Sequence, residues 1–241
     1  MTVARRSERI VRPSTRAERR HWDAGLTIIV GADAVGVACL SGPVVAAAIV
    51  MPPYGRRVVG VRDSKMLSRS QRERLYPRIL RRALAVGLGA ASVAEIDRIN
   101  IYHATNLAMR RAICRVTDRQ HVLIDGLRVH GLEKQVGPNT AIVHGDATSN
   151  SIAAASIVAK VVRDRLMDRL ASRHPHYGWE HNAGYATLAH RRGIEEHGIT
   201  AFHRRSFARI KAVELGEQLE LDLAALEIGD APGAQRLLLP A

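Results

Sequence analysis

The sequence predicts an α/β protein, in which short buried strands alternate with helices around one sheet. Two β-type apolar runs, Ile28 to Val30 and Val44 to Met51, are joined through Gly36, Gly42 and Pro43. Short apolar runs bounded by Gly and Pro are typical of strands, so these two are expected to be neighbours. At 241 residues the chain is long enough to bury a substantial core, most simply as one domain with irregular ends.

The charge balance favours a polyanionic partner. Lys and Arg outnumber Asp and Glu by 36 to 23, which gives a formal net charge of +13. Such an excess favours nucleic acid through phosphate contacts and counterion release. A solvated basic surface is the alternative, because much of the excess lies in the first 20 residues. With five Tyr, two Trp and two Phe, a surface that stacks long single strands on aromatic rings is disfavoured.

The sequence also indicates a compartment. No apolar run reaches the 18 or more residues of a membrane span, so no membrane partner is expected. The Arg-rich start lacks the apolar core of a secretory signal. Cys39 and Cys114 fit a reducing compartment and cannot build a disulfide framework. We expect a cytoplasmic protein.

Three regions are expected along the chain. Residues 1–25 form a basic arm without apolar periodicity and are predicted to be disordered or loosely attached. Residues 26–213 form the folded domain. Residues 214–241 begin as an acidic amphipathic segment and continue as an unpatterned tail.

Within the folded domain the elements alternate. After the first two strands, Ser68 or Ser70 is expected to cap a helix, which Pro77 breaks or kinks unless the helix begins late. Residues 86–93 predict a strand, and the narrow apolar face of residues 101–116 predicts a helix. The remaining expected elements are a strand over 122–124, a loop over 127–139, a strand over 141–143, a helix over 151–172, and a helix that Thr187 caps and Gly198 ends.

Three predicted strands end in a carboxylate at a loop: Asp33, Asp125 and Asp146. In an open α/β sheet the loops at the carboxyl ends of neighbouring strands converge, which would place these acids in one cleft. Clustered carboxylates raise each other's pKa unless a cation neutralises them, so the cluster predicts Mg²⁺ or Mn²⁺, which prefer oxygen ligands. Two such ions can activate water and stabilise an in-line phosphoryl displacement. The pattern therefore predicts cleavage of a phosphodiester.

The chain further carries a series of short motifs in a fixed order. They include Ser41-Gly42-Pro43-Val44-Val45, Asp63-Ser64-Lys65, Glu95-Ile96-Asp97, Ile124-Asp125-Gly126, Gly145-Asp146, Ser151-Ile152-Ala153-Ala154-Ala155-Ser156, Tyr177-Gly178-Trp179, Gly184-Tyr185 and His203-Arg204-Arg205-Ser206-Phe207. Through these motifs the chain, from about Ile28 to Ile210, resembles type 2 ribonuclease H, or ribonuclease HII.

The resemblance implies a fold and an activity. The fold is the ribonuclease-H-like mixed five-stranded sheet flanked by helices, here with a helical C-terminal extension, and residues 26–213 would be the catalytic domain. The activity is metal-dependent endonucleolytic cleavage of the RNA strand of RNA-DNA hybrids and at ribonucleotides embedded in duplex DNA. The implied cofactor is Mn²⁺ or Mg²⁺, and a monomer is expected.

The resemblance also exposes a departure from the family. Its four acids correspond here to Asp33, Ala34, Asp125 and Asp146, so the catalytic Glu is replaced by an alanine that offers no oxygen to a metal. The family's Gly-Arg/Lys-Gly element is Gly36-Val37-Ala38 here. Activity is therefore expected to be reduced, and a catalytically dead homologue that binds hybrids without cutting stays open as the alternative.

The resemblance implies further contacts with substrate. Tyr185 would stack on the sugar beside the scissile junction, and Ser64 and Lys65 would form a phosphate-binding turn. Gly36 belongs to a loop whose backbone would grip the ribonucleotide at the RNA-DNA junction, and Asn100 would make the family's backbone contact. The alternative for Tyr185 is a core tyrosine, and Lys65 alone would more often be a solvated charge.

Other polar residues stay undecided at this stage. Arg204 and Arg205 could contact nucleic-acid backbone or cap the fold. No metal-ligand spacing is found among His103, His144, His181 and His190. A generic basic scaffold for a protein partner is disfavoured, because it leaves the aspartate cluster unexplained.

Overall fold

The computed structural model describes residues 12–129 and 131–214. At its centre lies a mixed five-stranded sheet in the order β3-β2-β1-β4-β5, which confirms the expected fold class. β2 pairs antiparallel with β1 and β3, whereas β4 pairs parallel with β1 and β5. The strands are β1 (Ile29–Val35), β2 (Val44–Val50), β3 (Ala85–Ala91), β4 (His121–Asp125) and β5 (Asn139–Ile142).

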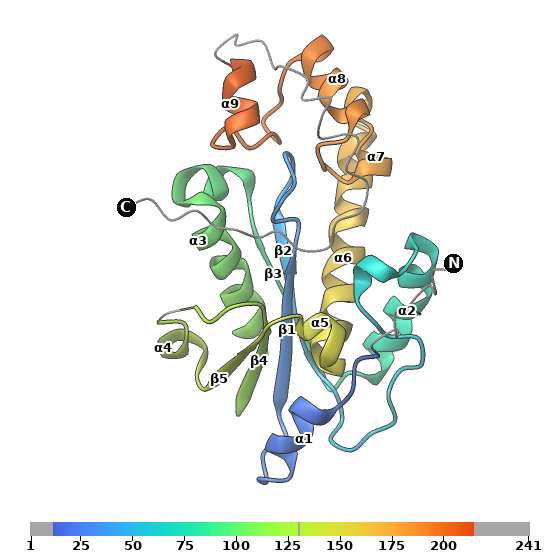
Figure 1. Cartoon of the computed structure of the whole chain (residues 1–241), viewed down its shortest axis with the longest axis vertical. Coiled ribbons are helices and arrows are strands. Elements are labelled where there is room, and N and C mark those ends of the chain that lie inside the picture. The colour runs from blue at the N-terminus through green and yellow to red at the C-terminus, as the bar shows by residue number, and fades with distance from the viewer. Residues whose placement is uncertain (1–11, 130, 215–241) are drawn as a thin grey trace, which may run out of the picture.

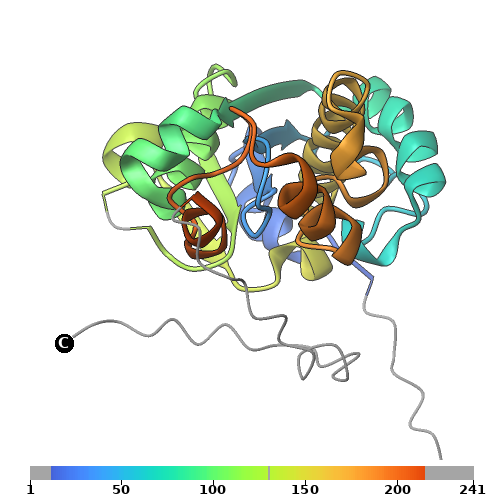
Figure 2. The same cartoon turned by 90° about the horizontal axis from the view of Figure 1, so that it is seen from above.

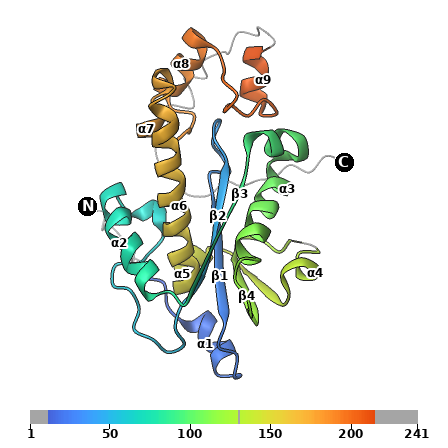
Figure 3. The ribbon, with the colours of Figure 1, turned by 180° about the vertical axis from the view of Figure 1, so that it is seen from behind.

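Helices cover both faces of this sheet. One face packs on α3 and the other on α6, with α2 outside α6, as the two opposite views show (Figures 1 and 3). Beyond one end of the sheet lie α7, α8 and α9 (Figure 1), and the view from above shows the sheet between its helical layers (Figure 2). The helices are α1 (Arg16–Trp22), η1 (Ser64–Met66), α2 (Arg69–Arg82), α3 (Val93–Ile113), α4 (Glu133–Val136), α5 (Gly145–Thr148), α6 (Asn150–Ala171), η2 (Pro175–Tyr177), α7 (Trp179–Asn182), α8 (Leu188–His197) and α9 (Ala208–Glu214).

Small residues let the helices lie close to the sheet. A Cβ added to Gly31 of β1 would collide with the backbone of Ser151 in α6, and one added to Gly89 of β3 would collide with the backbone of α3. The alanines of α6 that face the sheet, Ala154 and Ala155, are fully buried. This close approach brings the polar residues at the start and middle of α6 against β1.

Three caps match the sequence. Ser68 forms a capping box with Gln71 at the start of α2, Thr187 caps α8, and Gly198 ends it. Each is a side chain or a glycine that satisfies backbone groups which a helix leaves unpaired at its ends.

The structure corrects the expected arm. Residues 16–22, assigned to a loosely attached segment, form helix α1, in which Glu18 and Trp22 are buried. The Glu18 carboxylate accepts hydrogen bonds from Ser149 and Ser151 at the start of α6. This part of the arm is therefore fixed to the domain by a buried polar contact that no local sequence pattern predicts. Residues 1–11 of the arm and 215–241 of the tail lie outside the described residues.

Two other expectations were wrong. Helix α2 continues through Pro77 to Arg82 instead of stopping at it. The expected loop over 127–139 contains the short helix α4, whose Val136 packs into the core. Among the helices of residues 12–129 and 131–214, none combines the length and the apolar character that crossing a membrane requires.

Candidate active site

Asp33 and Asp125 project from neighbouring parallel strands onto the same face of the sheet. The register of β1 and β4 pairs Ala32 with Ile124, so the next residue of each strand is an aspartate. Side chains alternate between the faces of a strand, and Leu123, two residues before Asp125, packs with Ile152 of α6. Both carboxylates therefore lie on the α6 side.

Asp146 reaches the same place from the chain that follows β5. His144 has a left-handed backbone conformation (φ 54°), which turns the chain into α5. The backbone N–H of Asp146 then donates to Oδ1 of Asp125 at 3.3 Å. Asp33 and Asp146 are 6% and 4% exposed. The structure thus brings together the three aspartates that the sequence pattern singled out.

The electrostatics of the cluster are those of crowded carboxylates. Burial raises the pKa of Asp33 to about 7; the charges of Asp125 and Asp146 add to the rise, and a hydrogen bond from Ser156 opposes it. The pKa of Asp146 is raised by burial, then by Asp125 and Asp63, against the opposing charge of Lys65. Each shift disfavours the charged form, so the cluster favours a proton or a cation nearby.

The donor chemistry of the cluster fits a hard divalent cation. Its carboxylate oxygens are the ligands that Mg²⁺ and Mn²⁺ prefer, and a cation would relieve the repulsion that raises these pKa values. Within residues 12–129 and 131–214, no group of three or more His, Cys, Asp and Glu side chains is already spaced around a metal position. The carboxylates would therefore have to draw closer around an ion.

The turn that carries Ser64 and Lys65 borders the cluster. Nζ of Lys65 lies 3.6 Å from Oδ2 of Asp146, and its side chain is 81% exposed. The Ser64 hydroxyl is buried and lies 2.8 Å from the hydroxyl of Ser156, which in turn contacts Asp33. Lys65 is thus open to an incoming anion, whereas Ser64 supports Asp33 from behind.

Two buried arginines fix the loop after β1. Arg204 donates to the carbonyls of Gly36, Val37 and Gly42, and Arg163 donates to those of Pro43 and Ser41. Gly36 has a φ of 87°, and an added Cβ would collide with Arg163. The sequence left Arg204 open between two roles, and the structure shows that it caps the fold.

Tyr185 lies at the edge of the same region, above a buried histidine pair. Its ring is 42% exposed, and Nζ of Lys160 lies 5.6 Å from the ring centroid. The Tyr185 carbonyl is bonded at 2.8 Å by Nδ1 of His190, whose Nε2 lies 3.0 Å from Nε1 of Trp179 and 3.2 Å from His203. Tyr185 is therefore a partly exposed ring on a rigid buried support.

Comparison with known proteins agrees with this geometry. The family model for Ribonuclease HII matches residues 30–210. This chain belongs to the ribonuclease HII family. The Ribonuclease HII of Thermosynechococcus vestitus (strain NIES-2133 / IAM M-273 / BP-1) is 50% identical over 194 residues, which cover 80% of this chain and 89% of that protein.

Solved structures share the fold. The ribonuclease HII of Archaeoglobus fulgidus, solved in complex with PCNA, has a TM-score of 0.65 and 27% identity over 73% of this chain and 93% of that one. The ribonuclease H2 of Pyrococcus horikoshii OT3 has a TM-score of 0.67 and 23% identity over 78% and 97%. As a ribonuclease HII, the chain is a member of a nuclease family that cuts RNA in RNA-DNA hybrids.

Ala34 lies apart from the carboxylates of this ribonuclease HII. Its side chain packs against the core cluster on the α3 face, on the opposite side of β1 from Asp33. It is only partly buried, since β1 ends at the next residue. A longer side chain at position 34 would have to pass around the strand end to reach Asp33.

Asn100 is not gathered into the acidic cluster. It interrupts α3 with φ 62° and ψ 169°, and its side chain accepts a hydrogen bond from the backbone N–H of His103 at 3.1 Å. Locally, Asn100 caps the second half of α3. The residue is exposed, so it remains accessible to a nucleic-acid backbone while it caps the helix.

Sequence reasoning missed two contributors to the site. Ser156 supports Asp33 from the middle of α6, and its signal was a hydroxyl within an otherwise apolar helical face. Asp63, the cap of η1, adds negative charge that raises the pKa of Asp146. Its signal was weaker, because a capping Asp is common in any turn.

Proposed function

We propose that this ribonuclease HII cuts the RNA strand of RNA-DNA hybrids and cuts at ribonucleotides embedded in duplex DNA, using water activated with Mn²⁺ or Mg²⁺. The observation that carries the proposal is the convergence of three carboxylates, those of Asp33 and Asp146 buried and that of Asp125 partly buried, beside an exposed Lys65. Two of them are neighbours on parallel strands, and the third contacts the second through its backbone. A reaction that used no metal ion would not explain why three mutually repelling carboxylates lie together.

Asp33, Asp125 and Asp146 would hold the metal. When bound, a divalent cation supplies positive charge that offsets the carboxylates and the charge developing on the phosphate, and it lowers the pKa of water. Asp125 receives the Asp146 N–H, and Asp33 is supported by Ser156. These contacts orient two carboxylates before substrate arrives, and a preorganised charge contact is worth about 2.7–4 kcal/mol in the transition state.

The remaining residues would position the substrate. Lys65 offers an ammonium group to a phosphate, at the cost of its contact with Asp146. Tyr185 offers an exposed ring face for a sugar, held in place by the His190 contact to its carbonyl. The exposed loop tip at Val37 and Ala38 offers no cation to the junction.

The alternative of a homologue that binds without cutting rests on Ala34, Val37 and Ala38 alone. Membership of a nuclease family does not favour it. We infer a working enzyme whose rate is lowered by the missing carboxylate.

The test is cleavage of a labelled RNA-DNA hybrid with Mn²⁺ and with Mg²⁺, beside an Asp125→Asn variant. Asparagine keeps the shape of the side chain and removes the charge. We expect cutting that the variant loses by at least about 100-fold, in line with the value of one preorganised charge contact. Tight binding without any cutting by the unaltered chain would favour the alternative.

A further inference from the structure

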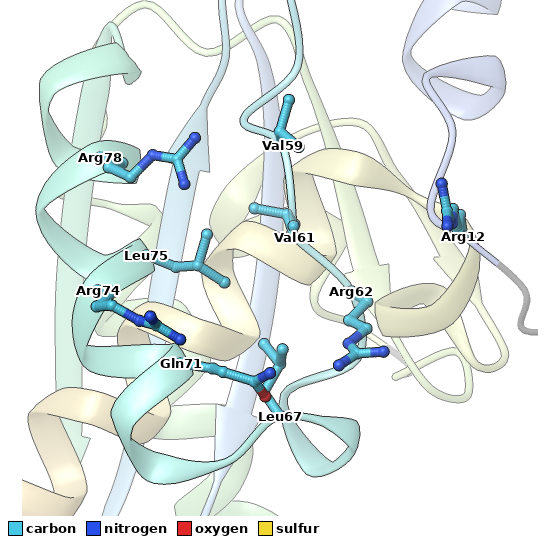
Figure 4. A pocket seen from close by; sticks show the side chains of 10 residues that line it. Arg12, Val59, Val61, Arg62, Leu67, Gln71, Arg74, Leu75 and Arg78 are labelled. Atoms are coloured by element: carbon cyan, nitrogen blue, oxygen red, sulfur yellow. The ribbon is translucent and has the colours of Figure 1, made fainter.

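A second basic feature lies outside the acidic cluster, in a groove of about 460 Å³ between α2 and the chain before η1. We call it the α2 groove. Arg74 and Arg78 project into it from α2, opposite Arg62 and Arg12 (Figure 4). Its floor is apolar and includes Val61 and Leu75.

The four arginines of the groove have no carboxylate partners among residues 12–129 and 131–214. In the part of the chain that the structure describes, none of them forms an ion pair or a side-chain hydrogen bond. The nearby acids are engaged elsewhere, since Glu73 pairs with Arg165 and Asp63 accepts from the backbone N–H of Lys65. Like charges one helical turn apart, as in Arg74 and Arg78, repel each other. The groove is therefore a concentration of uncompensated positive charge.

This charge continues along α2. A second hollow shares Val59 and Arg78 with the groove and adds Arg56, Arg81 and Arg82. Residues 74, 78, 81 and 82 follow the spacing of one helical face. From residue 74 to residue 82 the row spans about 12 Å at 1.5 Å per residue. Phosphates of one strand repeat every ~3.4 Å along the duplex axis, so such a row matches about three to four of them.

The α2 groove begins beside the turn that borders the acidic cluster. Arg62 and Leu67, which line the groove, flank the η1 turn that carries Ser64 and Lys65. A strand whose phosphate contacts Lys65 could therefore continue into the groove. Guanidinium groups suit phosphate because they donate in a planar fork.

We propose that the α2 groove binds successive backbone phosphates of one strand of a nucleic-acid duplex, at a distance from the position of cleavage. The proposal rests on the proposed function, because the duplex is the one presented to the acidic cluster. The groove offers arginines to phosphates and no acceptor-donor pattern for base edges, so its contribution is independent of sequence.

The test is equilibrium binding of a plain DNA duplex, which contains no ribonucleotide and separates this contact from cleavage. Arg74→Ala/Arg78→Ala is compared with Arg115→Ala/Lys134→Ala, which removes the same two charges from exposed positions after α3 and on α4, across the sheet. A duplex of about 20 base pairs is compared with one of about 6, too short to occupy both the cleft and the row.

We expect Arg74→Ala/Arg78→Ala to weaken binding of the long duplex by about tenfold or more and to reduce the salt slope of log K by about 1.8, at ~0.9 per phosphate contact. The affinity for the short duplex, and the affinity of the control variant for the long duplex, should stay unchanged. An equal loss of affinity in the control variant would show that only net charge matters and would overturn the proposal. An unchanged salt slope in Arg74→Ala/Arg78→Ala would overturn it as well. Binding of inorganic pyrophosphate is measured in the same variants. If pyrophosphate binds saturably and this binding requires Arg74 and Arg78, while the salt slope for the duplex is unchanged, the groove binds a small free anion and the proposal is overturned.

Failure of the two proposals would look different. If the unaltered chain does not cut the hybrid, but Arg74→Ala/Arg78→Ala still weakens binding of the long duplex, the nuclease proposal is rejected and the groove proposal stands. If the unaltered chain cuts the hybrid, but Arg74→Ala/Arg78→Ala does not change duplex binding, the groove proposal is rejected and the nuclease proposal stands.

Discussion

At the scale of single residues, the site is governed by how three carboxylates tolerate one another. Two of them, Asp33 and Asp146, are almost fully buried, and the pKa of each is raised by burial and by the charge of Asp125. A buried repulsive cluster lowers stability in the free protein, and it is retained where a cation or substrate relieves it. The ionisation of Asp33 is therefore measurable in the folding equilibrium.

We predict that, without divalent cations, the contribution of Asp33 to stability falls as pH rises. Its pKa is about 7 in the folded chain against an ordinary value of 3.8. The folded state binds the proton more tightly, so the contribution is fully present below pH ~4 and is lost progressively up to pH ~7. The loss is on the order of 4 kcal/mol at about 1.4 kcal/mol per pKa unit. Urea unfolding at a series of pH values measures it, and Asp33→Asn should remove this component; an identical pH profile in the variant would contradict it.

The missing glutamate gives a second prediction. Ala34→Glu should raise hybrid cleavage, by up to about 100-fold if the new carboxylate reaches the cleft around the end of β1. Ala34→Gln has nearly the same size without the charge and should give no gain. If Ala34→Glu also gives no gain on a long hybrid, another part of the site limits the rate.

The altered loop after β1 gives a third prediction. Since Val37 and Ala38 occupy the exposed tip where the family has a basic residue and a glycine, we predict no preference for a single embedded ribonucleotide over a long hybrid. The ratio of the two initial rates measures this. A strong preference for the single ribonucleotide would refute it, and Val37→Lys/Ala38→Gly should raise that ratio.

At the scale of elements, α1 and the start of α6 act as one unit. The Glu18 carboxylate accepts from the hydroxyls of Ser149 and Ser151 and from the Ser151 N–H, so a buried acid satisfies the helix N-terminus. The backbone of Ser14 also bonds those of Thr148 and Asn150. Because α5 lies directly before α6, this docking also fixes the element that carries Asp146.

We predict that Glu18→Ala lowers the free energy of unfolding by about 3 kcal/mol, because hydrogen bonds to a charged group are worth ~1.5–3 kcal/mol and two serines would lose their acceptor. Urea unfolding measures the change. Arg20→Ala, exposed on the same helix, is the matched control and should stay within ~0.5 kcal/mol of the parent. Equal stability of the two variants would mean that α1 docks without the buried contact.

At the scale of the whole molecule, the acidic cluster and the basic groove are complementary. In the proposed function, the positive surface would attract the duplex, and the carboxylates would bind a cation that offsets their repulsion of phosphate. The net charge of +13 is thus compatible with a site made of aspartates.

We predict that Mn²⁺ or Mg²⁺ stabilises the whole chain against heat, by about 2.7 kcal/mol at a free concentration 100 times the Kd. Stabilisation should grow with pH toward 7, since the cation competes with the proton on Asp33. Scanning calorimetry with and without metal measures it. Asp125→Asn should lose most of the gain, and the same gain in that variant would place the ion elsewhere.

The sequence by itself determined the sheet-and-helix alternation, the capping residue Thr187, and the three aspartates, because each follows from a local pattern of apolar runs, turns and strand ends. Only the tertiary structure decided the role of Arg204, the support of Asp33 by Ser156, and the docking of α1 through Glu18. These contacts join residues more than 100 positions apart. Their strength comes from burial that the assembled sheet creates, and burial of a polar group becomes visible only when the partners that surround it are in place.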